Sequence, residues 1–259
     1  MPDSKPVSPK SWRGLAIAGG VVIALLWTQM SGELMRLLAP NGIGGIAYGR
    51  SIAASLSDVI VMAVVVCMTA GIGLARACHV SGVTASVTRP LIIVYAAVFG
   101  LATALCLTVT PLATDLSFED IAWLGFGSPI TEEIVFRGLA IGALMRLAGW
   151  RFLPAIIAPA ILFGVAHYAQ GDGLVDSAAI IAITGLGGLV FGWMFVRWGF
   201  NLWPAIFAHI GMNTLWMVFA LGENALGGWF GNVLRLGVIG LLIAGALVFG
   251  KATFYGHHR

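Results

Sequence analysis

Residues 128–147 read SPITEEIVFRGLAIGALMRL, an apolar run long enough to cross a membrane that also carries two adjacent carboxylates and, four residues after the second, a guanidinium. The chain has 259 residues, of which 59% are hydrophobic and 10% are charged, and its mean hydropathy is +0.96. Soluble domains are usually about one-quarter charged, so this composition predicts an all-α protein that crosses the bilayer several times. Because charged groups are costly inside a bilayer, Glu132, Glu133 and Arg137 are candidates for a functional site.

Similar apolar runs lie on both sides of this one, each about 17–25 residues long. We expect about eight transmembrane helices in a single integral membrane domain, residues 1–259. The apolar segment 117–127 is too short to span and is predicted to lie at the membrane interface. The N-terminal run is interpreted as an uncleaved first helix, because no A-x-A cleavage site follows it. The predicted spans are 14–31, 57–76, 90–111, 128–147, 153–169, 177–197, 200–220 and 229–250.

The distribution of lysine and arginine predicts the orientation of these spans. If the N-terminus is cytoplasmic, Arg36 and Arg50 fall on the outer side and ten basic residues fall on the cytoplasmic side. We therefore expect both termini in the cytoplasm. At 1.5 Å per residue, Glu132 would lie about 6 Å into its helix from the outer face, so that the site would occupy the outer half of the bilayer. The ten cytoplasmic residues are Lys5, Lys10, Arg13, Arg76, Arg89, Arg146, Arg151, Arg197, Lys251 and Arg259.

The first chemical motif is Glu132-Glu133-x-x-x-Arg137. Glu133 and Arg137 are four residues apart, on one helical face and in the favourable acid-before-base order. Glu132 is turned about 100° away and is predicted to face a water-filled cavity as a general base. Ser128 and Pro129 are interpreted as the N-cap and first residue of this helix, with the positive end of its dipole near Glu132. The alternative is a structural ion pair of Glu133 and Arg137, which leaves Glu132 unexplained.

Two further motifs place histidines on other spans. Phe163-x-x-x-His167 puts an aromatic wall and an imidazole on one face, where the imidazole could share a water with Glu132. His209-x-x-x-Asn213 puts an imidazole and an amide on one face, suited to stabilising an oxyanion or, for His209, to binding a metal. Singly, each motif is also explained by hydrogen bonding between helices. Three motifs on three helices at compatible depths favour one shared site.

Other features have simpler interpretations. A small-residue face on the sixth predicted span favours close helix packing rather than phosphate binding. Arg235 enters the last span and is predicted to snorkel toward its end, with a functional role as the alternative. The three cysteines follow neither CxxC nor zinc-knuckle spacing, so a disulfide framework is not expected. Scattered basic residues exclude nucleic acid as a partner. The small residues of the sixth span are Gly185, Gly187, Gly188 and Gly192, and the three cysteines are Cys67, Cys78 and Cys106.

The three motifs, in this order and spacing, resemble those of the CPBP family, the CaaX endopeptidases of the Ras-converting type and their bacterial Abi relatives. The resemblance covers residues 117–220, the expected catalytic core, including GGLVFGWMFVRWGFNLWPAIFAHIGMN at 187–213. The resemblance implies a peptidase with eight transmembrane helices that is located in a cell membrane, namely a bacterial inner membrane. By this resemblance Glu132 and His167 would activate the attacking water.

The resemblance also implies roles for the other motif residues. His209 and Asn213 would stabilise the tetrahedral oxyanion, while the supporting residues would be Glu133, Arg137 and Phe163. Family members are often described as metalloproteases, in which case Glu132, His167 and His209 would be the three protein ligands of an open zinc site. The chain has no HExxH motif. We favour direct activation of water by glutamate and histidine, with no cofactor required and zinc as the alternative.

These features favour an intramembrane endopeptidase that hydrolyses a peptide bond of a membrane-anchored or exported substrate within the lipid bilayer. The eukaryotic family members process prenylated C-terminal tails from the cytosol, whereas this site is predicted near the outer face. The alternative is a non-proteolytic membrane protein, such as a bacteriocin self-immunity factor or a scaffold. A small-solute transporter would favour inverted repeats, and no repeat relates the two halves of the chain.

Overall fold

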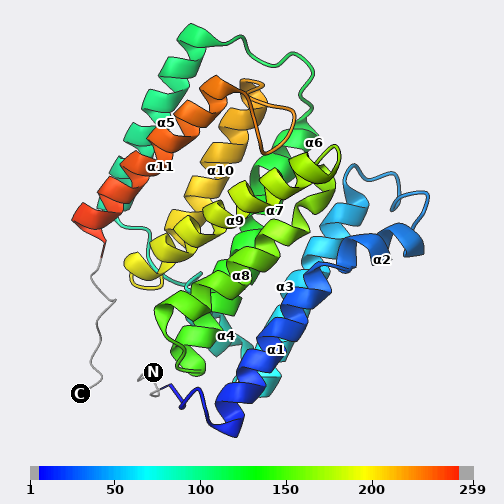
Figure 1. The fold of residues 1–259 in the computed structure, drawn as a ribbon, viewed down its shortest axis with the longest axis vertical. Coiled ribbons are helices and arrows are strands. Elements are labelled where there is room, and N and C mark those ends of the chain that lie inside the picture. Colours follow the sequence, from blue (N-terminus) through cyan, green and yellow to red (C-terminus); the bar gives the residue numbers. More distant parts are fainter. Residues whose placement is uncertain (1–5, 251–259) are drawn as a thin grey trace.

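The computed structural model describes residues 6–250, which contain helices and connections but no β-strand (Figure 1). The all-α fold class is therefore confirmed. Lys5, Lys251 and Arg259, which were counted for the topology, lie outside the described residues. The α-helices are α1 (Trp12–Thr28), α2 (Ser31–Leu38), α3 (Gly49–Ala70), α4 (Leu74–Ser81), α5 (Arg89–Val109), α6 (Phe118–Asp120), α7 (Ser128–Glu132), α8 (Phe152–Ala166), α9 (Leu174–Arg197), α10 (Trp203–Val218) and α11 (Trp229–Phe249).

Every predicted span coincides with helix, but not every helix is long enough to cross a membrane by itself. Within residues 6–250, five helices are sufficiently long and apolar, and a sixth candidate is the pair α1 and α2, which is bent by 46°. Helix α10 has only 16 residues, and the predicted span 128–147 is divided among several helical segments. The total of eight spans therefore remains a prediction.

Residues 118–147 form one continuous helical stretch, here called the central helix. It contains α6 and α7 together with three π-helical segments, in which the hydrogen bonds widen the turn: η1 (Ile121–Gly127), η2 (Glu133–Ile141) and η3 (Ala143–Leu147). Such widened turns occur frequently at functional sites. Glu132 lies where α7 passes into η2.

The predicted start of this helix was wrong. Ser128 has helical backbone angles, φ −59° and ψ −51°, whereas an N-cap residue is extended. The N-cap is Ser117, whose hydroxyl accepts from the Asp120 N–H while the Asp120 carboxylate accepts from the Ser117 N–H. Tyr48 also donates to Asp120, and these hydrogen bonds lower the pKa of the Asp120 carboxyl. The segment 117–127 therefore begins the central helix, and its location at the membrane interface stays a prediction.

Two hydrophobic clusters lie on either side of the central helix. One cluster joins α1, α3 and α4 with η2, η3 and α8, and the other joins α5, α9, α10 and α11. In Figure 1, α1 with α3 and α5 with α11 accordingly form the two flanks of the molecule, with α7 to α10 between them. The central helix is therefore held from both sides, and η2 is almost entirely buried.

Helices α8 and α9 pack closely because glycines line their contact. A Cβ atom on Gly164 would lie 2.5 Å from the carbonyl oxygen of Ile181, and one on Gly188 would lie 3.1 Å from Ala160. Gly192 is similarly close to Ile141 of the central helix. Gly187 has no atom within 4 Å of such a Cβ. The small face predicted for this helix thus serves packing at Gly188 and Gly192, whereas Gly187 borders an open space.

Candidate active site

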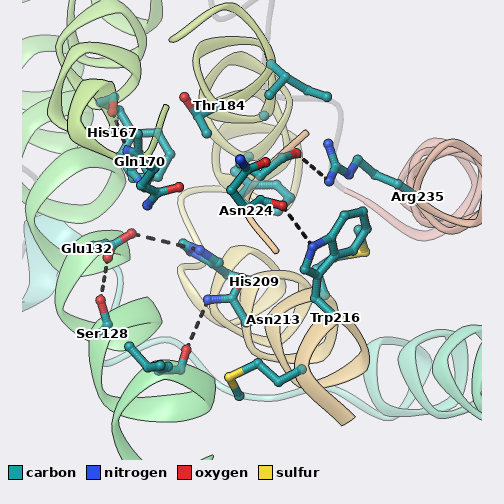
Figure 2. A pocket seen from close by; sticks show the side chains of 18 of the residues that line it. Ser128, Glu132, His167, Gln170, Thr184, His209, Asn213, Trp216, Asn224 and Arg235 are labelled. Atoms are coloured by element: carbon teal, nitrogen blue, oxygen red, sulfur yellow. Dashed lines mark hydrogen bonds and ion pairs between the residues drawn. The ribbon is translucent and has the colours of Figure 1, made fainter. Parts of the chain in front are cut away.

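A cavity of about 390 Å³ lies among the central helix, α8, α9, α10 and α11, and polar residues from each of the three motifs line it. We call it the central cavity. Figure 2 shows Glu132 and His167 on one side, His209 and Asn213 beside them, and Arg235 opposite. Apolar residues, including Phe163, Phe191 and Met212, complete the wall. The polar lining residues are Ser128, Glu132, His167, Gln170, Thr184, His209, Asn213, Glu223, Asn224 and Arg235.

Beneath the cavity, Glu133 and Arg137 form a buried ion pair. Arg137 Nη1 lies 3.0 Å from Glu133 Oε1, and the side chains are 1% and 0% exposed, respectively. His209 Nδ1 lies 2.8 Å from the same carboxylate oxygen. Because a carboxylate can only accept, Nδ1 carries the proton of this bond and Nε2 is left toward Glu132. The predicted i,i+4 pair is therefore present, and it also holds a histidine from another helix.

Glu132 turns away from this pair and faces the central cavity. Its Oε1 accepts a hydrogen bond from the Ser128 hydroxyl, whereas its Oε2 has no hydrogen-bond partner. Oε2 lies 3.8 Å from His209 Nε2, which is too long for a direct hydrogen bond. Oε2 is buried as the side chains stand, so a water bonded to both atoms requires a small movement of one of them. The site thus directs a carboxylate oxygen and an imidazole nitrogen toward one water position.

Phe163 is the aromatic wall of the site. The Arg137 guanidinium carbon lies 4.1 Å from the centroid of its ring, and the His167 ring lies 4.6 Å away on the same helix. His167 Nδ1 is 2.7 Å from the Phe163 carbonyl oxygen. Since a carbonyl only accepts, Nδ1 is the protonated nitrogen and Nε2 is free to accept. Phe163 thus packs both against the buried cation and against a histidine of the cavity.

Asn213 connects α10 to the start of the central helix. Its Nδ2 donates to the backbone carbonyl of Leu124 at 3.0 Å, and Leu124 belongs to the π-helical segment η1. A primary amide has two N–H donors and one acceptor oxygen, so one N–H group remains for another partner. The side chain is therefore anchored and still able to donate into the cavity that it lines.

The structure changes two details of the predicted site. Among the ion pairs of residues 6–250, the imidazole beside Glu132 belongs to His209, not His167. The reason is that Glu133 holds His209 toward the central helix, whereas His167 bonds to its own helix. The helix also begins earlier than predicted, because Glu132 is 14 residues beyond Phe118, and the depth of Glu132 in the bilayer stays a prediction.

Metal binding requires several ligands aimed at one point. In the described part of the chain, no group of three or more His, Cys, Asp or Glu side chains has such an arrangement. Glu132, His167 and His209 share the cavity, and because the Nδ1 atoms of both histidines are bonded within the protein, only their Nε2 atoms could act as ligands. The side chains do not fit a three-ligand zinc site as they stand. We therefore route no chemical step through a metal.

Several cavity residues were not predicted. Ser128 was interpreted as an N-cap but donates to Glu132, and its position four residues before this glutamate is the signal for that bond. Trp216, Asn224 and Gln170 line the cavity without belonging to any motif. Their position depends on how α8 to α11 pack, which no local sequence pattern indicates.

Taken together, the fold and the site define a polytopic, all-helical membrane protein with a cavity-facing glutamate above a buried Glu–Arg–His network. Residues 115–215 match the family model for type II CAAX prenyl endopeptidase Rce1-like proteins. This part of the chain is thus similar to Rce1-like proteins, and the resemblance to the CPBP family is confirmed over these residues.

One curated relative supports the same assignment. The "Putative membrane peptidase YdiL" of Bacillus subtilis (strain 168) is 31% identical over 93 residues, which cover 36% of this chain and 34% of that protein. The chain therefore aligns with about one-third of the length of this relative. No solved structure matches the chain significantly.

Proposed function

We propose that this protein is an intramembrane endopeptidase in which Glu132 activates the attacking water. The observation that supports this most strongly is the free Oε2 of Glu132, 3.8 Å from His209 Nε2 at the wall of a cavity. A structural ion pair would require only Glu133 and Arg137, which pair with each other and with His209, although Glu133 Oε2 and both Nη atoms of Arg137 have no hydrogen-bond partner. Glu132 is the additional carboxylate, and its side chain lines the central cavity.

In the proposed reaction, Glu132 accepts a proton from a water while the water oxygen attacks the carbonyl carbon of the scissile peptide bond. His167 Nε2 accepts a hydrogen bond that orients this water. The C–N bond then breaks, and the proton held by Glu132 passes to the leaving amine. The products are a carboxylic acid and an amine, so atoms and charge balance without any further reactant.

His209 and Asn213 are proposed to stabilise the tetrahedral oxyanion. Because His209 Nδ1–H is engaged by Glu133, His209 must also be protonated at Nε2 in order to donate to the oxyanion. Carboxylates at 2.8 Å and 3.8 Å flank the ring and balance the charge of an imidazolium. Asn213 contributes the N–H group that its bond to Leu124 leaves free. Glu133 and Arg137 are positioning residues, because they fix the His209 ring.

We further propose that the substrate is a membrane-anchored or exported peptide that enters from the outer side. The central cavity is lined by Gln170, which follows α8, and by Glu223 and Asn224, which precede α11. In the predicted topology, the connections that carry these residues are outside. The cavity therefore reaches the side of the molecule opposite the predominantly basic connections.

Cysteine accessibility tests this orientation. In a variant with Cys67, Cys78 and Cys106 replaced by alanine, Asp172→Cys should react with a membrane-impermeant maleimide in intact cells. Thr84→Cys, in the connection between α4 and α5, should react only after permeabilisation. Both positions are exposed in the structure. The reversed labelling pattern would place the cavity on the cytoplasmic side and remove exported peptides as substrates.

The function itself is tested by comparing cells that produce the wild-type protein with cells that produce Glu132→Gln at equal abundance. We expect the variant to accumulate at least one uncleaved membrane or envelope protein, detected by mass spectrometry of protein termini. Glu119→Gln is the matched control, because Glu119 is an exposed residue at the start of the same helix. If the sets of protein termini are identical for wild type and a stably folded Glu132→Gln variant, the peptidase assignment is wrong.

A further inference from the structure

Arg235 of α11 lines the central cavity but lies outside residues 115–215, which carry the family match. Its Nη2 donates to the backbone carbonyl of Ala225 at 2.8 Å, and its guanidinium carbon lies 4.2 Å from the centroid of a Trp216 ring. Figure 2 shows the side chain reaching from α11 toward the cavity, across from Glu132 and His209. The Arg235 side chain thus extends toward the start of α11, as predicted, and also lines the central cavity.

The structure around Trp216 holds this guanidinium in a defined place. Trp216 Nε1 donates to the Asn224 carbonyl at 3.1 Å. Glycines let the connection between α10 and α11 fold closely around the indole, since a Cβ on Gly227 would lie 2.2 Å from the Trp216 ring and one on Gly231 would lie 3.0 Å from it. Gly227 also has a φ of +65°, which a residue with a side chain rarely adopts. The platform beneath the arginine is therefore fixed by tertiary packing.

The charge of Arg235 is not balanced within the protein. Among the described residues 6–250, no carboxylate oxygen is paired with its guanidinium within 4.0 Å, although Glu223 and Glu132 line the same cavity. A guanidinium has five N–H donors, of which one is used by Ala225. An arginine within an apolar helix is costly and usually marks a binding site or an ion pair. The remaining donors are available to a ligand in the cavity.

We propose that Arg235 binds a carboxylate of the peptide substrate and thereby selects which peptides enter the cavity. The guanidinium presents two parallel N–H groups that match the two oxygens of a carboxylate. A peptide supplies this group at its C-terminus or on an acidic side chain. The inference rests on the proposed peptidase function, because it places the recognised group and the scissile bond of one peptide at opposite walls of one cavity.

The test measures binding in the Glu132→Gln background, so that it does not depend on hydrolysis. The protein is placed in phosphatidylcholine nanodiscs. Three fluorescent N-dodecanoyl tripeptides are compared by polarisation: Ala-Val-Leu with a free carboxylate, Ala-Val-Leu amide, and Ala-Asp-Leu amide. We expect at least one carboxylate peptide to bind about 10- to 100-fold more tightly than the neutral amide, as for a hydrogen bond to a charged group.

Adding Arg235→Gln should abolish this preference and leave the affinity for the neutral amide unchanged. Arg235→Lys should retain part of the preference, because it keeps the charge without the planar donor pair. Arg50→Gln is the matched control, since Arg50 also donates to backbone carbonyls but lies outside the cavity. The two carboxylate peptides distinguish a C-terminal carboxylate from a side-chain carboxylate.

Several outcomes would overturn the proposal. Equal binding of all three peptides, or no binding, means that Arg235 does not recognise a carboxylate. An equal loss for charged and neutral peptides in Arg235→Gln means that the arginine only holds the Ala225 connection in place. If no peptide carboxylate is preferred, but phosphatidylglycerol in the nanodiscs weakens peptide binding to Glu132→Gln and not to Glu132→Gln, Arg235→Gln, the bound anion is a lipid phosphate. Carboxylate preference together with identical protein termini in cells with the wild-type protein and with Glu132→Gln would refute the peptidase function while leaving the anion site intact.

Discussion

Arg137→Met is expected to lower the free energy of unfolding by about 3–5 kcal/mol, the cost of leaving one member of a buried ion pair without its partner. Glu133 is completely buried, and Arg137 is 1% exposed. Methionine fills a similar volume but leaves the carboxylate in an apolar interior, where only the His209 N–H still bonds to it. Thermal or denaturant unfolding of the purified protein in detergent, followed by circular dichroism, measures the loss.

A double-mutant cycle separates this pair from a simple packing effect. Glu133→Gln alone leaves Arg137 as an uncompensated cation, so it should also destabilise the protein. The double variant Glu133→Gln, Arg137→Met removes both charges and should be more stable than the sum of the single losses predicts. Arg36→Met is the control. Glu33 and Arg36 form an exposed ion pair in which the acid also precedes the base, and exposed pairs contribute little to stability. Strict additivity of the two buried changes would show that the pair is not energetically coupled.

Much of this architecture can be predicted from local sequence. The apolar runs identify the helices, because only a helix satisfies its own backbone hydrogen bonds in lipid. The spacing of Glu133 and Arg137 predicts their pairing, since residues four apart share a face. Phe163 and His167 are adjacent for the same reason, with ring centroids 4.6 Å apart. Each of these predictions concerns neighbours within a single helix.

The details that could not be predicted depend on contacts between helices or on competing local signals. His209 lies beside Glu132 because Glu133, from a different helix, accepts its Nδ1–H, and no pattern within α10 contains this information. The start of the central helix was misplaced because Ser128-Pro129 resembles an N-terminus, while the reciprocal bonds of Ser117 and Asp120 define the actual one. The meeting of Arg235 with Trp216 likewise joins two helices across a ten-residue connection, residues 219–228.

Glu132→Gln is expected to lower kcat by about 10²- to 10⁴-fold, the usual contribution of a general base. Glutamine preserves the shape of the side chain and its bond to Ser128, but it cannot accept a proton from water. The measurement uses purified enzyme and a peptide that contains the cleavage site identified from the protein termini. Ser128→Ala is the matched comparison: it removes the hydrogen bond to Oε1 and leaves the basic Oε2 in place, so it should cost about tenfold or less, in the range of one ordinary hydrogen bond.

Coupling between Glu132 and the two histidines then distinguishes the arrangement in the structure from the one predicted by the motifs alone. Because Glu132 Oε2 and His209 Nε2 face the same water position, the double variant Glu132→Gln, His209→Gln should be little slower than the slower single variant. His167→Gln removes the acceptor that is proposed to orient the same water, so it should also combine less than additively with Glu132→Gln, though less strongly than His209→Gln. If His167 is the more strongly coupled histidine, the water is held between Glu132 and α8, and His209 acts only on the oxyanion.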